Sequence, residues 1–246
     1  GLAGLGEVLL GLVVGSFLNV VAWRLPRGKS IAYPPSHCPR CGAGILPQDN
    51  IPVFSWLVLK ARCRVCLGPI SARYPTVEAL TGVAALLVYR HDGISYLLLL
   101  HLAMVFGLIA LSLIDLDTWL LPLDITVPLI GLGLVASVLP GGLGWQHSLI
   151  GAAVGGAIIV IIGKVAELLM GKEAMGEGDA WLMSAIGAFL GAGMVLLVLF
   201  LASVQGLVIG AWLIRRRLGA HLHDAPAAGG RDPGLVGGRL EPLRLL

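Results

Sequence analysis

Long apolar runs that carry almost no charge dominate this sequence and limit what it can fold into. They lie at residues 2–23, 76–89, 96–114, 120–139, 148–170 and 180–214. A helix that spans the bilayer core needs about 20 apolar residues. The chain is 57% hydrophobic and 13% charged, whereas soluble domains carry about 25% charged residues. These figures exclude a soluble enzyme and indicate an all-α polytopic membrane protein.

The length of each run predicts about seven transmembrane helices. The run 2–23 is longer than the apolar core of a signal peptide and contains Glu7 and Asn19, so we expect a retained span. The run 180–214 has 35 residues and is interrupted by Gly191 and Gly193. It therefore predicts a short helix, a turn and a longer helix.

The distribution of Lys and Arg predicts the orientation. Residues 24–75 contain eight basic residues, and segments rich in Lys and Arg stay on the cytoplasmic side. Alternation from there places the N-terminus in the periplasm, leaves Arg90 as the single basic residue of the outer loops, and puts the C-terminus in the cytoplasm. The expected organisation is a first transmembrane helix at 1–23, a small cytoplasmic domain at 24–75, a transmembrane core at 76–214 and a disordered cytoplasmic tail at 215–246.

Four cysteines lie in the polar segment as two CxxC pairs: Cys38 with Cys41, and Cys63 with Cys66. This spacing is typical of a structural zinc site with four thiolate ligands. Gly42 and Gly68 follow the pairs and give the backbone freedom that such turns need. A pair of disulfides is disfavoured because the cytoplasm is reducing. A redox or metal-free role is the remaining alternative.

Two acids are expected at the same depth in the membrane. Asp115 follows an uninterrupted apolar run, and Asp179 directly precedes another; the predicted topology puts both at the cytoplasmic face. Carboxylates that meet resist double ionisation, so one acts as acid and the other as base. In an aspartic protease such a pair activates a water that attacks a peptide carbonyl.

A purely structural role is the alternative for these acids. An Asp next to a helix start is most often an N-cap, which would account for Asp179 and also for Asp117. Gly176 and Gly178 favour the catalytic interpretation, because glycines beside an acid let a peptide backbone approach closely.

Several sequence motifs follow one another along the chain. They are Gly15-Ser16-Phe17-Leu18-Asn19-Val20-Val21 with Arg24-Leu25-Pro26, the CxxC pairs, Asn50-Ile51-Pro52, Arg73-Tyr74-Pro75 with Glu78, Ile114-Asp115-Leu116-Asp117-Thr118 with Leu121-Pro122, and Gly171-Lys172-Glu173 with Gly176-Glu177-Gly178-Asp179. From about Gly11 to Ile214 the chain closely resembles the bacterial prepilin peptidases, the type IV leader peptidases of the GxGD aspartic protease class.

The resemblance implies a multi-pass enzyme of the bacterial inner membrane. It implies cleavage of the basic leader from type IV prepilins and type II secretion pseudopilins, followed by N-methylation of the new terminus with S-adenosylmethionine. By motif position, Asp115 and Asp179 are the catalytic aspartates and Cys38, Cys41, Cys63 and Cys66 are the zinc ligands. Membrane lipid is a further expected partner, and nucleic acid is not.

The sequence departs from the family pattern at three places. Leu123, with Asp124 after it, stands where an acid often follows Leu-Pro, and Ala61 stands where the family often has Gly. Nothing after Ile214 resembles the usual last span, so we expect a truncated, frameshifted or divergent C-terminus. The alternatives to a peptidase are a proton-coupled transporter, for which no internal repeat is found, and a degenerate scaffold that binds prepilins without cutting them.

Overall fold

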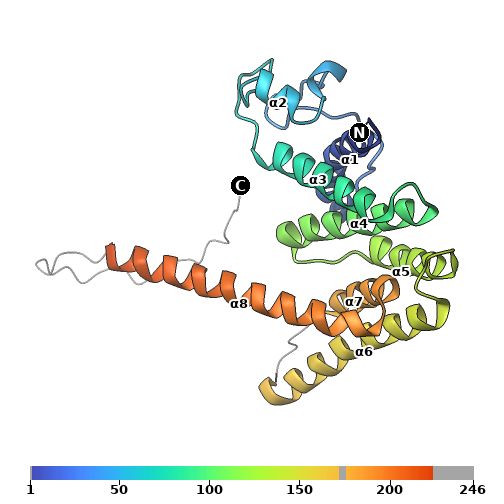
Figure 1. Ribbon diagram of the computed structural model, residues 1–246. Coiled ribbons are helices and arrows are strands. Elements are labelled where there is room, and N and C mark those ends of the chain that lie inside the picture. The colour runs from blue at the N-terminus through green and yellow to red at the C-terminus, as the bar shows by residue number, and fades with distance from the viewer. Residues whose placement is uncertain (1, 172–175, 224–246) are drawn as a thin grey trace, which may run out of the picture. The chain divides into compact units, whose positions relative to one another are not determined.

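The computed structural model describes residues 2–171 and 176–223, and the described elements are helices with short 3-10 turns (Figure 1). They are α1 (Leu2–Arg24), η1 (Leu25–Arg27), η2 (Pro47–Asp49), α2 (Phe54–Val58), α3 (Arg73–Asp92), α4 (Tyr96–Thr118), α5 (Leu123–Val138), α6 (Trp145–Met170), α7 (Glu177–Leu190) and α8 (Ala192–His223). The chain divides into two compact units, Gly1–Val195 and Leu196–Leu246. The first unit holds every candidate site residue.

The apolar runs predicted the long helices well. Each run lies within a helix or closely matches one, and the run 180–214 is broken as expected. Gly191 ends α7 with φ of 79°, and its N–H donates to Gly187 O at 2.8 Å. A side chain is strained at that φ, so glycine allows the tight connection from α7 to α8.

Fewer of the described helices meet the length and composition needed to cross a membrane than the apolar runs predict. Among the described residues, four segments are long and apolar enough to cross a membrane: Gly4–Arg27, Tyr96–Thr118, Trp145–Met170 and Ala192–Arg215. At about 1.5 Å per residue, α5 and α7 fall short of a bilayer core of about 30 Å. Helix α3 is long enough but carries several charged residues near its ends. The count of seven crossings therefore stays a prediction.

The predicted C-terminal tail differs from the structure where it begins. Helix α8 continues to His223, nine residues past the expected end at Ile214. Residues 224–246 lie outside the described part of the chain, and the expected disorder there stays a prediction.

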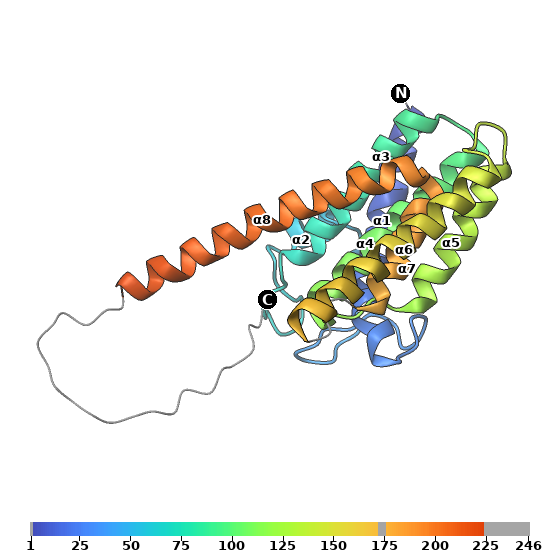
Figure 2. The ribbon, with the colours of Figure 1, turned by 90° about the horizontal axis from the view of Figure 1, so that it is seen from below.

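Within the first unit, α4 lies between two groups of helices (Figures 1 and 2). On one side it packs against α1 and α3, in a core of buried side chains: Leu18, Ala22, Val77, Ala110, Leu113 and Ile114. On the other side Leu111 packs with Leu129 of α5 and Ala185 of α7. Burial on two sides fixes the last turns of α4, where the first candidate aspartate lies.

Residues 25–72, between α1 and α3, form the cysteine segment, which has little apolar core. Arg24 anchors its start, because the buried guanidinium donates to Ser30 O at 3.1 Å and Pro34 O at 2.6 Å. Glu78 of α3 anchors its middle by accepting the Val53 N–H at 2.7 Å. Polar contacts thus hold the cysteine segment to the helices.

Candidate active site and metal centre

Asp115 lies in the last turn of α4. The preceding residue, Ile114, is fully buried in the core, whereas Asp115 is exposed. The helix ends at Thr118, and Trp119 adopts a left-handed conformation with φ of 58° while donating its N–H to Asp115 O at 2.9 Å. The helix end therefore presents the Asp115 carboxylate outside the packed core.

Asp179 lies in the first turn of α7 and is half-buried. The N-cap of α7 is Gly176, and the Asp179 N–H donates to Gly176 O at 3.2 Å. Asp117 lies inside α4, near its C-terminal end. The N-cap interpretation is therefore wrong for both aspartates.

The structure brings the carboxylates of Asp115 and Asp179 close enough to repel each other electrostatically. They come from the end of α4 and the start of α7, which are distant in sequence. Their joint catalytic role stays a prediction. A pair of acids with one exposed and one half-buried member is suited to share a proton.

The approach of α7 to the chain after α4 depends on Gly178. A Cβ at that position would lie 2.7 Å from Leu121 Cβ and 3.4 Å from Leu121 O. A methyl group there must push the start of α7 away from the 119–122 turn and so move Asp179 relative to Asp115. We therefore expect Gly178→Ala to lower the rate of peptide cleavage about tenfold or more, measured as kcat in purified membranes.

Gly176→Ala is the matched variant. The nearest atom to a Cβ at Gly176 is Asp179 Oδ2 at 3.9 Å, so the methyl group has space. The loss at Gly176 should be clearly smaller than that at Gly178. Equal losses in both variants would contradict the steric explanation.

The four cysteines of the cysteine segment form a single cluster. One ligand atom from each of Cys38, Cys41, Cys63 and Cys66 lies within 4.8 Å of the others. All four are free thiols, and the Cys38 and Cys66 sulfurs are 3.9 Å apart, well beyond the length of a disulfide bond. This cluster could hold a metal ion, as the two CxxC pairs predicted.

Two turns of the same form build the cluster. Cys38 N–H donates to Ala43 O at 2.8 Å, and Cys63 N–H donates to Gly68 O at 2.8 Å. The left-handed residues of the two turns are Gly42, with φ of 72°, and Leu67, with φ of 55°. The predicted role of Gly68 in backbone freedom is therefore wrong, because the strained position is one residue earlier.

Gly68 has a packing role instead. A Cβ on Gly68 would lie 2.8 Å from Arg40 Cδ. The absence of a side chain thus lets Arg40, which is between the first two cysteines, lie against the second turn.

The thiols have unequal acidities. Backbone hydrogen bonds from Cys41 and Arg40 lower the pKa of Cys38 to about 6. At Cys41 the backbone N–H of Ala43 lowers the pKa, but desolvation and the neighbouring thiols outweigh it and raise the pKa to about 11. Thiolates crowded together thus oppose further ionisation, and a bound cation would compensate their charge.

Several polar side chains of the helices have partners within the structure. His101 Nδ1 lies 2.7 Å from Asp92 Oδ2. Asn19 is buried and donates to Gly15 O at 3.1 Å. Glu167 pairs with Lys164 at 3.1 Å. Among the described residues, Glu7 Oε2 is a buried oxygen without a hydrogen-bond partner.

Two contacts of α3 were missed by sequence reasoning. Arg73 pairs with Asp117 of α4, and Glu78 accepts the Val53 N–H of the cysteine segment. Both residues belong to the motif Arg73-Tyr74-Pro75 with Glu78, but no role could be assigned to them there. The sequence feature that could have indicated the ion pair is a single Arg just before the apolar run 76–89.

Comparison with known proteins decides the family. The model described as "Bacterial Peptidase A24 N-terminal domain" matches residues 9–91, and the one described as "Type IV leader peptidase family" matches residues 102–211. A protein from Neisseria gonorrhoeae named "Prepilin leader peptidase/N-methyltransferase" is 37% identical over 243 residues, covering 89% of this chain and 85% of that protein. The chain belongs to the type IV leader peptidase family.

Other members of the type IV leader peptidase family with the same printed name are similarly close. The protein from Myxococcus xanthus (strain DK1622) is 45% identical over 206 residues, covering 84% of this chain. The match spans 62% of that protein, which is less than two thirds of its length. The protein from Aeromonas salmonicida (strain A449) is 38% identical over 234 residues, covering 85% of this chain and 80% of that protein. No solved structure matches the chain.

Proposed function

We propose that this chain is a membrane-embedded aspartic endopeptidase that removes the basic leader from type IV prepilins and type II secretion pseudopilins. The family membership supports the leader peptidase activity. The single observation that carries the mechanism is the approach of the Asp115 and Asp179 carboxylates at the ends of α4 and α7.

In the proposed mechanism the two aspartates share one proton. Asp179 is the more buried carboxyl, and burial disfavours the charged form, so it keeps the proton. Asp115, the exposed member of the pair, takes a proton from water as that water attacks the peptide carbonyl. Asp179 donates a hydrogen bond to the carbonyl oxygen, and its proton then passes to the leaving amine.

The site also suits the shape of the substrate. A prepilin leader is basic, and the segment after it is apolar, so the scissile bond lies where a polar segment meets a membrane helix. Asp115 stands beside exposed apolar side chains, with Leu116 70% and Trp119 87% exposed. An apolar substrate segment can pack there with its peptide bond next to the aspartates.

The metal and the methyl donor are further parts of this proposal. Four clustered thiols fit Zn²⁺, which prefers tetrahedral sulfur ligands, and the ion would cross-link a segment of low apolar content. S-adenosylmethionine would supply the methyl group for the new N-terminal amine, in line with the printed names of the relatives.

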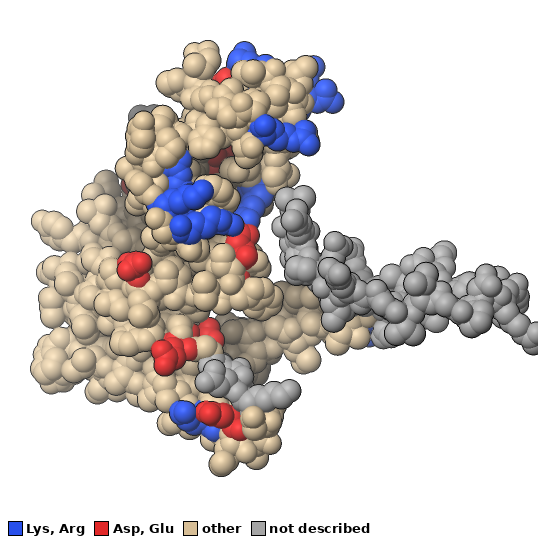
Figure 3. Space-filling view, turned by 180° about the vertical axis from the view of Figure 1, so that it is seen from behind, with Lys and Arg blue, Asp and Glu red and all other residues tan. Residues whose placement is uncertain are grey.

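We propose an inner-membrane location with a cytoplasmic cysteine segment and a periplasmic N-terminus, with α3, α5 and α7 completing seven crossings. The positive charge supports this orientation. The exposed basic residues of the cysteine segment are Arg27, Lys29, Arg40, Lys60, Arg62 and Arg64. On the face drawn in Figure 3, Lys and Arg side chains gather mainly on the upper part, where Figure 1 draws this segment.

Cleavage of a prepilin by the purified chain tests the proposed function. The protein is mixed in detergent with a prepilin that carries its leader, and the products are resolved by mass. The expected result is loss of the leader at a single peptide bond. An unchanged prepilin, with a cleaving relative as positive control, would refute the proposal.

A further inference from the structure

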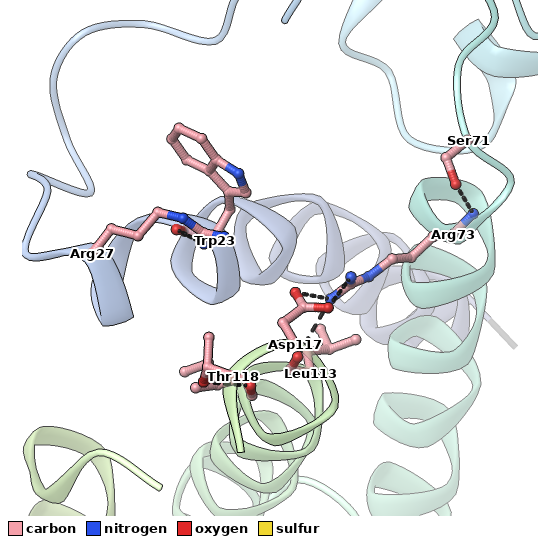
Figure 4. Close-up of polar contacts among 8 residues, drawn as sticks. Trp23, Arg27, Ser71, Arg73, Leu113, Asp117 and Thr118 are labelled. Atoms are coloured by element: carbon pink, nitrogen blue, oxygen red, sulfur yellow. Dashed lines mark hydrogen bonds and ion pairs between the residues drawn. The ribbon is translucent and has the colours of Figure 1, made fainter. Parts of the chain in front are cut away.

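A bidentate ion pair joins α3 to the last turns of α4 (Figure 4). Asp115 belongs to the same part of α4. Arg73 Nη1 donates to Asp117 Oδ1 at 2.6 Å, and Arg73 Nη2 donates to Asp117 Oδ2 at 2.8 Å. Arg73 Nη2 also donates to Leu113 O at 3.4 Å. The side chains of Arg73 and Asp117 are 37% and 23% exposed, so the pair is only partly screened by solvent.

The two residues that Arg73 contacts on α4 flank Asp115. Leu113 and Asp117 are four residues apart and share one face of the helix. Asp115 is two residues from each, which corresponds to about 200° of rotation, so it lies on the opposite face. Arg73 therefore contacts α4 on the face opposite Asp115. It does not occupy the space around the Asp115 carboxylate.

The turn needs such support because it is a helix end. The last four carbonyls of a helix have no partner within the helix, and terminal turns fray. Asp115 is the fourth residue from the end of α4, which stops at Thr118. A cation at this end also interacts favourably with the helix dipole.

The position of Arg73 at the start of α3 is also fixed. Arg73 is the first residue of α3, and its N–H donates to Ser71 Oγ at 3.2 Å. Helix α3 packs closely on α1, since a Cβ at Gly15 would lie 2.8 Å from Glu78 Cα. The Arg73 guanidinium thus belongs to a helix whose position is fixed by close packing on α1.

We propose that Arg73 is a positioning residue for Asp115: its pairing with Asp117 and Leu113 O fixes the final turn of α4, so that Asp115 meets Asp179 in cleavage geometry. This inference rests on the proposed function. The Arg73 guanidinium bonds to Asp117 and Leu113 O on α4, so its effect on Asp115 passes through the α4 backbone.

Steady-state cleavage of a prepilin by full-length variants in detergent tests this role. A displacement of about 1 Å at a reacting group can cost about 100-fold in rate. We expect Arg73→Ala to lower kcat about 10- to 100-fold with KM changed less than about twofold, because the groups that bind substrate stay in place. Arg73→Lys keeps the charge and should recover part of kcat.

Two further variants separate positioning from general stability. Asp117→Asn removes the same pair without changing side-chain size, and the double variant with Arg73→Ala should be no slower than the slower single variant. Asp49→Asn is the matched control, because Asp49 forms a comparable bidentate pair with Arg64, at 2.6 and 2.8 Å, within the cysteine segment. Its kcat should stay within about twofold of that of the unsubstituted chain.

The outcomes distinguish this proposal from the proposed function. Cleavage by the unsubstituted chain with unchanged kcat in folded Asp117→Asn and Arg73→Ala overturns the positioning role alone. So does a rise in KM without loss of kcat, a multiplicative loss in the double variant, or an equal loss in Asp49→Asn. Absence of cleavage by the unsubstituted chain overturns both. If Arg73→Ala fails to insert, the comparison of Asp117→Asn with Asp49→Asn decides.

Discussion

Asp115→Asn and Asp179→Asn each abolish prepilin cleavage, with kcat reduced by about 10²- to 10⁴-fold or more. Each variant removes one carboxyl from a pair that must hold one proton and one negative charge. Asn matches Asp in size but can neither accept the proton of water nor pass a proton to the amine. Single-turnover conversion of a prepilin in detergent measures the loss of rate. In steady-state assays, KM should stay close to that of the unsubstituted chain.

The control for this prediction is Asp124→Asn. Asp124 is an exposed acid in the first turn of α5, soon after the Leu-Pro string, and it forms no part of the proposed pair. That variant should cleave at nearly the rate of the unsubstituted chain. Full cleavage by either Asp115→Asn or Asp179→Asn, in protein that inserts and folds, would remove the aspartic mechanism.

The helices could be predicted from the sequence because burial in lipid or protein demands continuous apolar runs. Gly191 marked the break between α7 and α8 correctly. The start of α3 at Arg73 was set three residues too late, because its first turn is polar and is stabilised by contacts with α4. An apolar run indicates the part of a helix that is buried in lipid or protein. It does not indicate a polar turn that forms an ion pair with another helix.

The candidate active site likewise contains features that the apolar runs predict and features that they do not. Asp115 and Asp179 could be placed together, since both follow from where apolar runs end and from which side those ends lie on. The Arg73 pair with Asp117 depends on the distance between two helices, which sequence spacing does not contain. The left-handed Leu67 was likewise hidden, because the form of the turn, set by the cysteines and its hydrogen bonds, overrode the preference for glycine next to it.

The second large effect concerns the metal. We expect about one equivalent of zinc per chain by elemental analysis, and loss of that zinc when any of the four cysteines is replaced by Ser. Structural zinc sites with thiolate ligands contribute about 10–16 kcal/mol of binding free energy near neutral pH. Loss of one thiolate opens the tetrahedral site, and the cysteine segment, which lacks an apolar core, should then become sensitive to limited proteolysis.

The pH dependence of zinc retention follows from the thiols. Zinc binds thiolates, so binding must displace protons, and the raised pKa of Cys41, about 11, makes that displacement costly. Cys38, with its pKa lowered to about 6, loses its charge as pH falls through that value. Zinc affinity should therefore already weaken as pH falls through the neutral range, where Cys41 must lose a proton to bind, and more steeply below about 6, where Cys38 must lose one too. A chromogenic chelator measures this affinity as a function of pH.

His37→Ala is the control for the zinc prediction. His37 precedes Cys38, and its Nδ1 lies 3.1 Å from Pro35 O, so it stands next to the cluster without being one of the four clustered ligands. This variant should keep its zinc because four thiolates complete a tetrahedral site. Zinc lost from His37→Ala but kept by Cys66→Ser would show that the ligand set includes the imidazole, and folded chain without metal would show that the cluster has another role.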